Sequence, residues 1–105
     1  MLEYIRTEIT PKLLVAQLTL LQSGYDAGVS YAPDAGSGAH RTALRVPGET
    51  EASLLEFLVC RTTHSVSARW CFARSGESGT MPLDPGGADG ARLITAFVQG
   101  IVSGR

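Results

Sequence analysis

Large apolar side chains near the C-terminus recur every three to four residues. This spacing predicts an amphipathic helix over residues 90–102, with Asp89 as its N-cap and with its apolar side laid on a sheet. Polar side chains occupy the opposite side of the same segment, so only one face is expected to be buried. The apolar stripe consists of Leu93, Ile94, Phe97, Val98, Ile101 and Val102.

A second helix is predicted near the N-terminus, over residues 11–23. Thr10 is a suitable N-cap, Pro11 suits the first helical position, and Gly24 suits the position after the helix end. Its apolar side chains cover most of the helix circumference, so we expect it to be sandwiched in the core or shared with a second subunit. Residues 1–9 fit either a helix or a short strand. The apolar side chains of the helix are Leu13, Leu14, Leu18, Leu20 and Leu21.

The stretch from Ser53 to Arg74 predicts a β-hairpin with a four-residue connection at 62–65. Apolar and polar residues alternate along both strands, so the hairpin is expected to have one apolar face and one mixed face. A helix over 51–61 is the alternative, because several of its residues are good helix formers. In the hairpin register Leu55, Phe57 and Val59 lie opposite Phe72, Trp70 and Ala68, while Glu56, Leu58 and Cys60 lie opposite Cys71, Arg69 and Ser67.

Two further strands are predicted upstream, over 27–32 and 41–46, because apolar or small and polar residues alternate in both. Residues 75–90 hold little to bury and are predicted to be a long flexible loop. The chain is therefore expected to be one α+β domain over 1–105, in the order α-β-β-β-β-α. Both helices would pack on one face of a four-stranded antiparallel meander.

The second face of this sheet is predicted to be only partly suited to water, because it mixes charged and apolar side chains. Glu56 and Arg69 are expected to pair there. We expect this face, or an edge strand, to form a protein interface in a homodimer. Its predicted residues are Arg45, Glu56, Leu58, Arg69 and Cys71.

Composition narrows the possible partners. The net charge is −1, which gives no electrostatic basis for binding nucleic acid or an anionic membrane. No apolar run approaches the length of a membrane span, and no signal peptide is visible. Two cysteines in such a composition are expected to be free thiols, as in a cytoplasmic protein. Every basic residue except Lys12 is arginine, and Ala and Gly are frequent, which is typical of a GC-rich bacterial genome.

Several sets of residues could carry chemistry, and none assembles a known motif. Cys60, His64 and Cys71, with His40, lack the spacing of a zinc module, and the Cys60–His64 pair lacks the groups that activate a nucleophile. The glycine clusters at 36–38 and 86–90 lack the Lys-Ser/Thr of a phosphate loop. The acidic residues Glu77, Asp84 and Asp89 match no calcium loop. No catalytic, metal or cofactor residue is therefore predicted.

The sequence thus favours a small non-enzymatic protein-binding module, such as an adaptor, regulator or chaperone-like protein, that associates with itself. The alternative is a small enzyme or ligand-binding protein. Its pocket would lie between the 75–90 loop and the sheet edge, lined by Tyr31, His40 and His64. A preformed cavity with convergent polar groups would favour the alternative.

Overall fold

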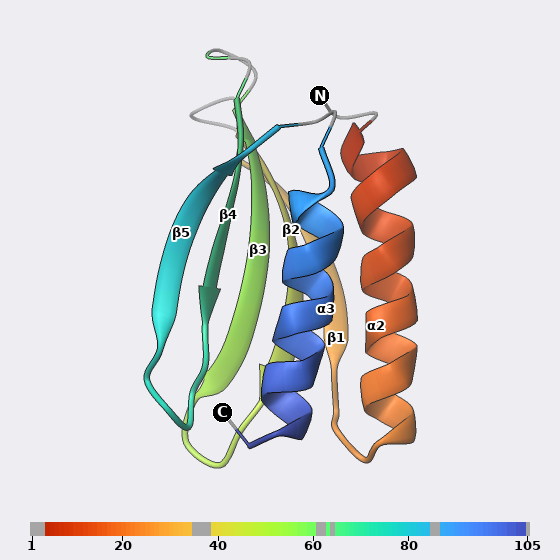
Figure 1. Ribbon diagram of the computed structural model, residues 1–105, viewed down its shortest axis with the longest axis vertical. Coiled ribbons are helices and arrows are strands. Elements are labelled where there is room, and N and C mark those ends of the chain that lie inside the picture. Colours follow the sequence, from red (N-terminus) through yellow and green to blue (C-terminus); the bar gives the residue numbers. More distant parts are fainter. Residues whose placement is uncertain (1–3, 35–38, 61–62, 64, 85–86, 105) are drawn as a thin grey trace.

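The computed structural model describes residues 4–34, 39–60, 63, 65–84 and 87–104. It has an α+β architecture, in which a helical layer covers one face of an antiparallel sheet (Figure 1). The sheet is a meander with the order β1-β2-β3-β4-β5. Its elements are the π-helical turn η1 (Ile5–Ile9), α2 (Thr10–Gln22), β1 (Gly28–Asp34), β2 (Ala39–Pro47), β3 (Ala52–Cys60), β4 (Ser65–Cys71), β5 (Ser78–Leu83) and α3 (Asp89–Val102).

The α+β class and the antiparallel meander confirm the prediction, but the sheet has five strands and not four. Strand β5 occupies the middle of the stretch that was predicted to be a loop. The sequence did not predict this strand because it has few apolar residues. An edge strand pairs through backbone groups, so its side chains need not show an apolar pattern. Only Leu83 is buried in it, and its Pro82 is tolerated because β5 lies at the sheet edge.

The hairpin prediction for the centre of the chain is confirmed as β3 and β4, but its register was wrong by two residues. Leu55, and not Phe57, lies opposite Trp70, and Phe57 lies opposite Ala68. A shift of two residues keeps every side chain on its predicted face, so the pattern of apolar positions could not distinguish the two registers. The predicted connection at 62–65 moves to 61–64, of which the structure describes only Thr63.

The N-terminal helix begins earlier than predicted. Residue Thr10 has helical dihedral angles (φ −57°, ψ −45°) and is no N-cap, because η1 continues directly into α2. Within residues 1–9 the described part is helical, and its Ile5 and Ile9 are buried. The predicted end is confirmed: Gly24 has φ +92°, where glycine is favoured, and its N–H donates to the carbonyl of Leu21 at 3.1 Å.

Helix α3 matches its predicted range, but Asp89 lies in its first turn and Ala88 is at the N-cap position. The helix runs beside α2 in the same direction on one side of the sheet (Figure 1). Ile94, Phe97 and Ile101 are buried, and the ring of Phe97 stacks on Phe72 with centroids 5.3 Å apart. The core therefore lies between the helices and the inner face of the central strands. No helix among the described residues is long and apolar enough to cross a membrane.

Candidate functional site

Helix α2 turns a second apolar face away from the core. Its inward side is buried through Leu13, Ala16 and Leu20. The outward side carries four large apolar residues that we call the α2 stripe, and they follow one line along the helix because residues three and four apart are neighbours. Their exposed fractions are 50% for Leu14, 65% for Val15, 56% for Leu18 and 45% for Leu21.

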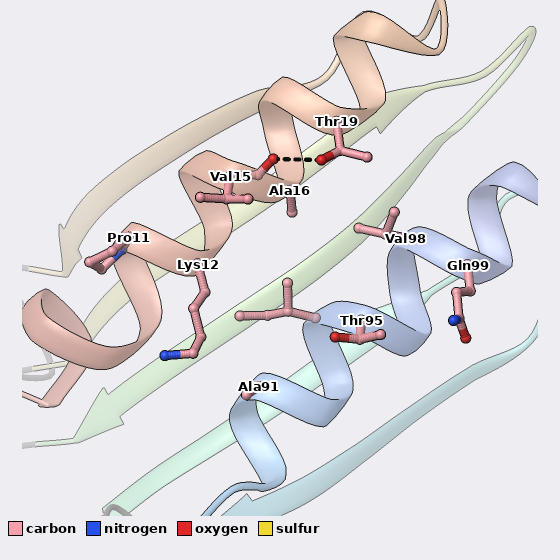
Figure 2. Close-up of a pocket in the computed structure, with 10 residues that line it drawn as sticks. Pro11, Lys12, Val15, Ala16, Thr19, Ala91, Thr95, Val98 and Gln99 are labelled. Carbon is pink, nitrogen blue, oxygen red and sulfur yellow. Dashed lines mark hydrogen bonds between the residues drawn. The ribbon is translucent and has the colours of Figure 1, made fainter.

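An apolar groove continues the α2 stripe toward α3. It encloses about 470 Å³ and is lined from α2 by Val15 and Ala16 and from α3 by Ile94 and Val98. Figure 2 shows Ala16 and Val98 turned toward each other across this groove, with Val15 on the α2 side. Because Val15 belongs to both, the α2 stripe and the groove form one continuous surface on the helical layer.

This surface carries almost no charge. From Ile9 to Tyr25 the only charged side chain is Lys12. Its ammonium lies 3.5 Å from the carboxylate of Glu8, one turn earlier, and both side chains are largely exposed, so this pair is worth little. A helix face that remains in water normally carries mainly polar and charged residues, whereas on the outward side of α2 the four residues of the α2 stripe stand beside the exposed Lys12, Thr19 and Gln22.

The five predicted interface residues all lie on the sheet face that is turned away from the helices, in agreement with the predicted faces. The expected pairing of Glu56 with Arg69 is confirmed: Oε1 of Glu56 accepts from Nε of Arg69 at 3.1 Å and from Nη2 at 2.5 Å. Arg41 adds a second ion pair, from its Nε to Oε2 at 2.8 Å. Leu58 and Cys71 are half-buried and Arg45 is exposed. That this face forms an interface remains a prediction.

The paired carboxylate explains how a charge is buried on an open sheet face. The side chain of Glu56 is only 3% exposed, while those of Arg41 and Arg69 are 50% and 52% exposed. The hydrogen bond and charge of Glu56 raise the pKa of Arg69 above its usual value. The two arginines thus cover the carboxylate and keep contact with water, and the cluster of Arg41, Glu56 and Arg69 has a net positive charge.

The structure separates the residues that were weighed for metal or nucleophile chemistry. Cys60 lies opposite Ser65 and Cys71 lies opposite Leu54, which places the two cysteines roughly 20 Å apart along the strands, and neither forms a disulfide bond. His64, the glycine cluster at 36–38 and Gly86 lie outside the described residues. Within the described part of the chain no three His, Cys, Asp or Glu side chains cluster as metal ligands.

The residues predicted to line a ligand pocket lie at opposite edges of the sheet. Tyr31 and His40 belong to β1 and β2, whereas the stretch from 75 to 90 supplies β5 at the opposite edge of the sheet. Four strand spacings, about 19 Å, lie between the two edges. Tyr31 and His40 do meet each other, because the Tyr31 hydroxyl and Nδ1 of His40 are hydrogen-bonded at 2.6 Å.

Fold and surfaces together define a small α+β protein with a largely apolar helical face on which Lys12 is the charged residue of α2. Comparisons with protein-family models, curated proteins and solved structures found no match. The sequence indicated this face, because apolar residues cover most of the circumference of the first helix. It left open whether the helix is sandwiched in the core or shared with a second subunit. The structure removes the first alternative, because only one side of α2 packs against the core.

Proposed function

We propose that this protein is a non-enzymatic protein-binding module, of an adaptor or regulatory kind, and that its first partner is a second copy of itself. The α2 stripe and the adjoining groove would form the contact. The observation that carries this proposal is the row of four large apolar side chains, each about half exposed, on one helix face. Isolated apolar residues are common on surfaces, but a continuous apolar patch marks an interaction site.

A second copy suits this face because a twofold contact brings a patch against itself. The α2 stripe is compatible with itself, since apolar side chains attract one another and no like charges meet. The outer sheet face is less compatible: among the described side chains of β2, β3 and β4 on this face, Arg41, Arg45 and Arg69 outnumber the carboxylate of Glu56, so two such faces would repel. Self-association is therefore expected on the helical side and not on the predicted sheet face.

The expected strength follows from the exposed area. Complete burial of a Leu or Val side chain is worth about 1.5–3 kcal/mol, so covering the exposed halves of the four side chains on both copies supplies roughly 6–13 kcal/mol. Association costs about 4–15 kcal/mol in lost freedom. The α2 stripe alone therefore supports a reversible dimer, with a Kd no tighter than about micromolar.

Sedimentation equilibrium of the full chain, from about 1 to about 500 µM, brackets this affinity. We expect a mass that rises with concentration from the 11.1 kDa monomer toward the dimer. Leu18→Lys should raise Kd roughly 30- to 300-fold, because it removes apolar contact from both copies and places two ammonium groups in the interface. Ala96→Lys is the matched control, since it adds the same charge at an exposed position on α3 that faces β4 and not α2.

Circular dichroism of both variants checks that they remain folded. A protein that stays monomeric at the highest concentration would contradict self-association and leave a different protein chain as the occupant of this face. Equal weakening by Ala96→Lys and Leu18→Lys would show that the contact lies elsewhere. Two cysteines that form no disulfide bond accord with a reducing compartment, and we place the module in the cytoplasm.

A further inference from the structure

A separate pocket of about 400 Å³ lies where η1 meets the edge of the sheet. Its apolar wall includes Ile5 and Val29, and its polar lining includes Arg6, Tyr31 and Thr42. None of these residues belongs to the α2 stripe or its groove, so the pocket is independent of the proposed dimer contact. Its size falls within the range of small-molecule sites.

The hydroxyl of Thr42 opens onto this pocket. Thr42 is only 3% exposed, and no described group hydrogen-bonds its side chain. No buried side-chain oxygen or nitrogen among the described residues lacks a hydrogen-bond partner, so this hydroxyl is reached by water from the pocket and is open to a ligand. Because Thr42 lines the pocket, a ligand oxygen placed there would satisfy it.

Two further groups on the same pocket can donate hydrogen bonds to oxygen atoms. The guanidinium of Arg6 forms no ion pair with any described carboxylate, and no Asp or Glu is among the described lining residues. Tyr31 is held by its hydrogen bond to His40 and by ring stacking at 5.9 Å between centroids, which positions its hydroxyl before any ligand arrives. Arg6 lies in η1, and short π-helical turns recur at functional sites.

We propose that this pocket binds a small molecule that carries a carboxylate on a short apolar body. Arg6 pairs with the carboxylate, because guanidinium and carboxylate groups match in charge and geometry. The Thr42 hydroxyl donates to the same carboxylate, the Tyr31 hydroxyl donates to it while accepting from Nδ1–H of His40, and Ile5 and Val29 cover the apolar body. This places the ligand-binding site at the β1 edge, away from the 75–90 stretch where the sequence located it.

The test is a ¹H–¹⁵N NMR titration of the full chain with three probes: hexanoate, 1-hexanol and inorganic phosphate. Hexanol keeps the apolar body without the charge, and phosphate keeps the charge without the apolar body. We expect saturable shifts with hexanoate in the amides of η1, β1 and Thr42, with Kd of about 1 mM for a ligand of this size. Both other probes should bind at least tenfold more weakly.

Two variants assign the roles of the side chains. Arg6→Gln should raise the hexanoate Kd about tenfold or more, whereas Arg74→Gln, an equally exposed arginine at the far end of the sheet, should leave it unchanged. Thr42→Val should raise Kd roughly threefold without lowering Tm, because the lost hydroxyl has no described partner in the folded chain.

Several results would overturn the proposal. Shifts that do not saturate by about 10 mM hexanoate would show that there is no site of this kind. Hexanoate binding that survives Arg6→Gln would remove the carboxylate contact. Phosphate or hexanol binding as tightly as hexanoate would contradict the combined requirement for charge and apolar body. Each readout is independent of the oligomeric state, so failure here leaves the dimer proposal standing and the reverse also holds.

Discussion

The buried carboxylate of Glu56 allows a sharp test of what holds the outer sheet face together. We expect Glu56→Gln to destabilise the fold more than Glu56→Leu does, although glutamine is the closer mimic. In the glutamine variant one carboxylate oxygen becomes an NH₂ donor that faces an arginine donor. The side chain at this position is only 3% exposed, so water cannot satisfy that donor.

The magnitude follows from the exposure of each partner. An unsatisfied buried donor costs about 1–3 kcal/mol, and the lost charge-assisted hydrogen bond adds to it, so we expect Glu56→Gln to lower the free energy of unfolding by about 2–3 kcal/mol. Arg41 and Arg69 are half exposed and can turn to water, which screens their charge and makes their pairing worth at most about 1 kcal/mol. Glu56→Leu should therefore cost about 1 kcal/mol or less, since leucine also packs with Leu54 and Leu58 on this face.

Urea unfolding measures both variants, with Trp70 fluorescence and circular dichroism as probes and one fixed protein concentration, because dimerisation would shift the midpoint. With a slope of about 1–3 kcal/mol per molar urea, Glu56→Gln should move the midpoint by roughly 1–2 M and Glu56→Leu by less than about 0.5 M. A larger loss for leucine than for glutamine would refute the reasoning. It would mean that the two arginines depend on the carboxylate despite their contact with water.

Two further predictions concern the core and its N-terminal border. Gly79→Ala should lower the free energy of unfolding by about 1–3 kcal/mol and red-shift Trp70 emission, because a Cβ on Gly79 would stand 2.4 Å from an indole carbon. An unchanged Tm and an unchanged emission spectrum would contradict this contact. Burial, and after it the charge of Glu8, raises the pKa of Tyr4 above 10.0. The unfolded chain therefore loses this proton at a lower pH than the folded chain. The free energy of unfolding should fall as pH rises from about 10 through the folded pKa. Tyr4→Phe should reduce the loss of urea midpoint between about pH 9 and about pH 11, and an identical loss in both proteins would argue against this assignment.

The two helices show how far apolar patterns predict packing. Helix α3 has a single apolar side, so its pattern correctly identified Ile94, Phe97 and Ile101 as core residues. Helix α2 is apolar around most of its circumference, and the pattern could not tell which leucines face inward. That choice depends on the packing of α2 beside α3 and β1, which no local pattern contains.

The sheet shows the complementary limit. Alternation predicted the faces of β2, β3 and β4 and the Glu56–Arg69 pair correctly, because side-chain direction depends only on odd or even position. Register and strand number depend on pairing between strands. The pattern of side chains therefore predicted neither the two-residue shift in the β3–β4 register nor strand β5. The sequence predicted Tyr31 and His40 as lining residues of one pocket. It could not show at which edge of the sheet they meet, because that depends on the strand order.

The prolines in the two outermost strands bear on how copies of this protein can meet. Pro33 in β1 and Pro82 in β5 each remove a backbone donor from an edge of the sheet. Edge-to-edge pairing leaves a new free edge after every addition, so it can grow into open filaments, whereas a twofold contact between helical faces closes after two copies. The edge prolines thus favour an association of limited size over aggregation.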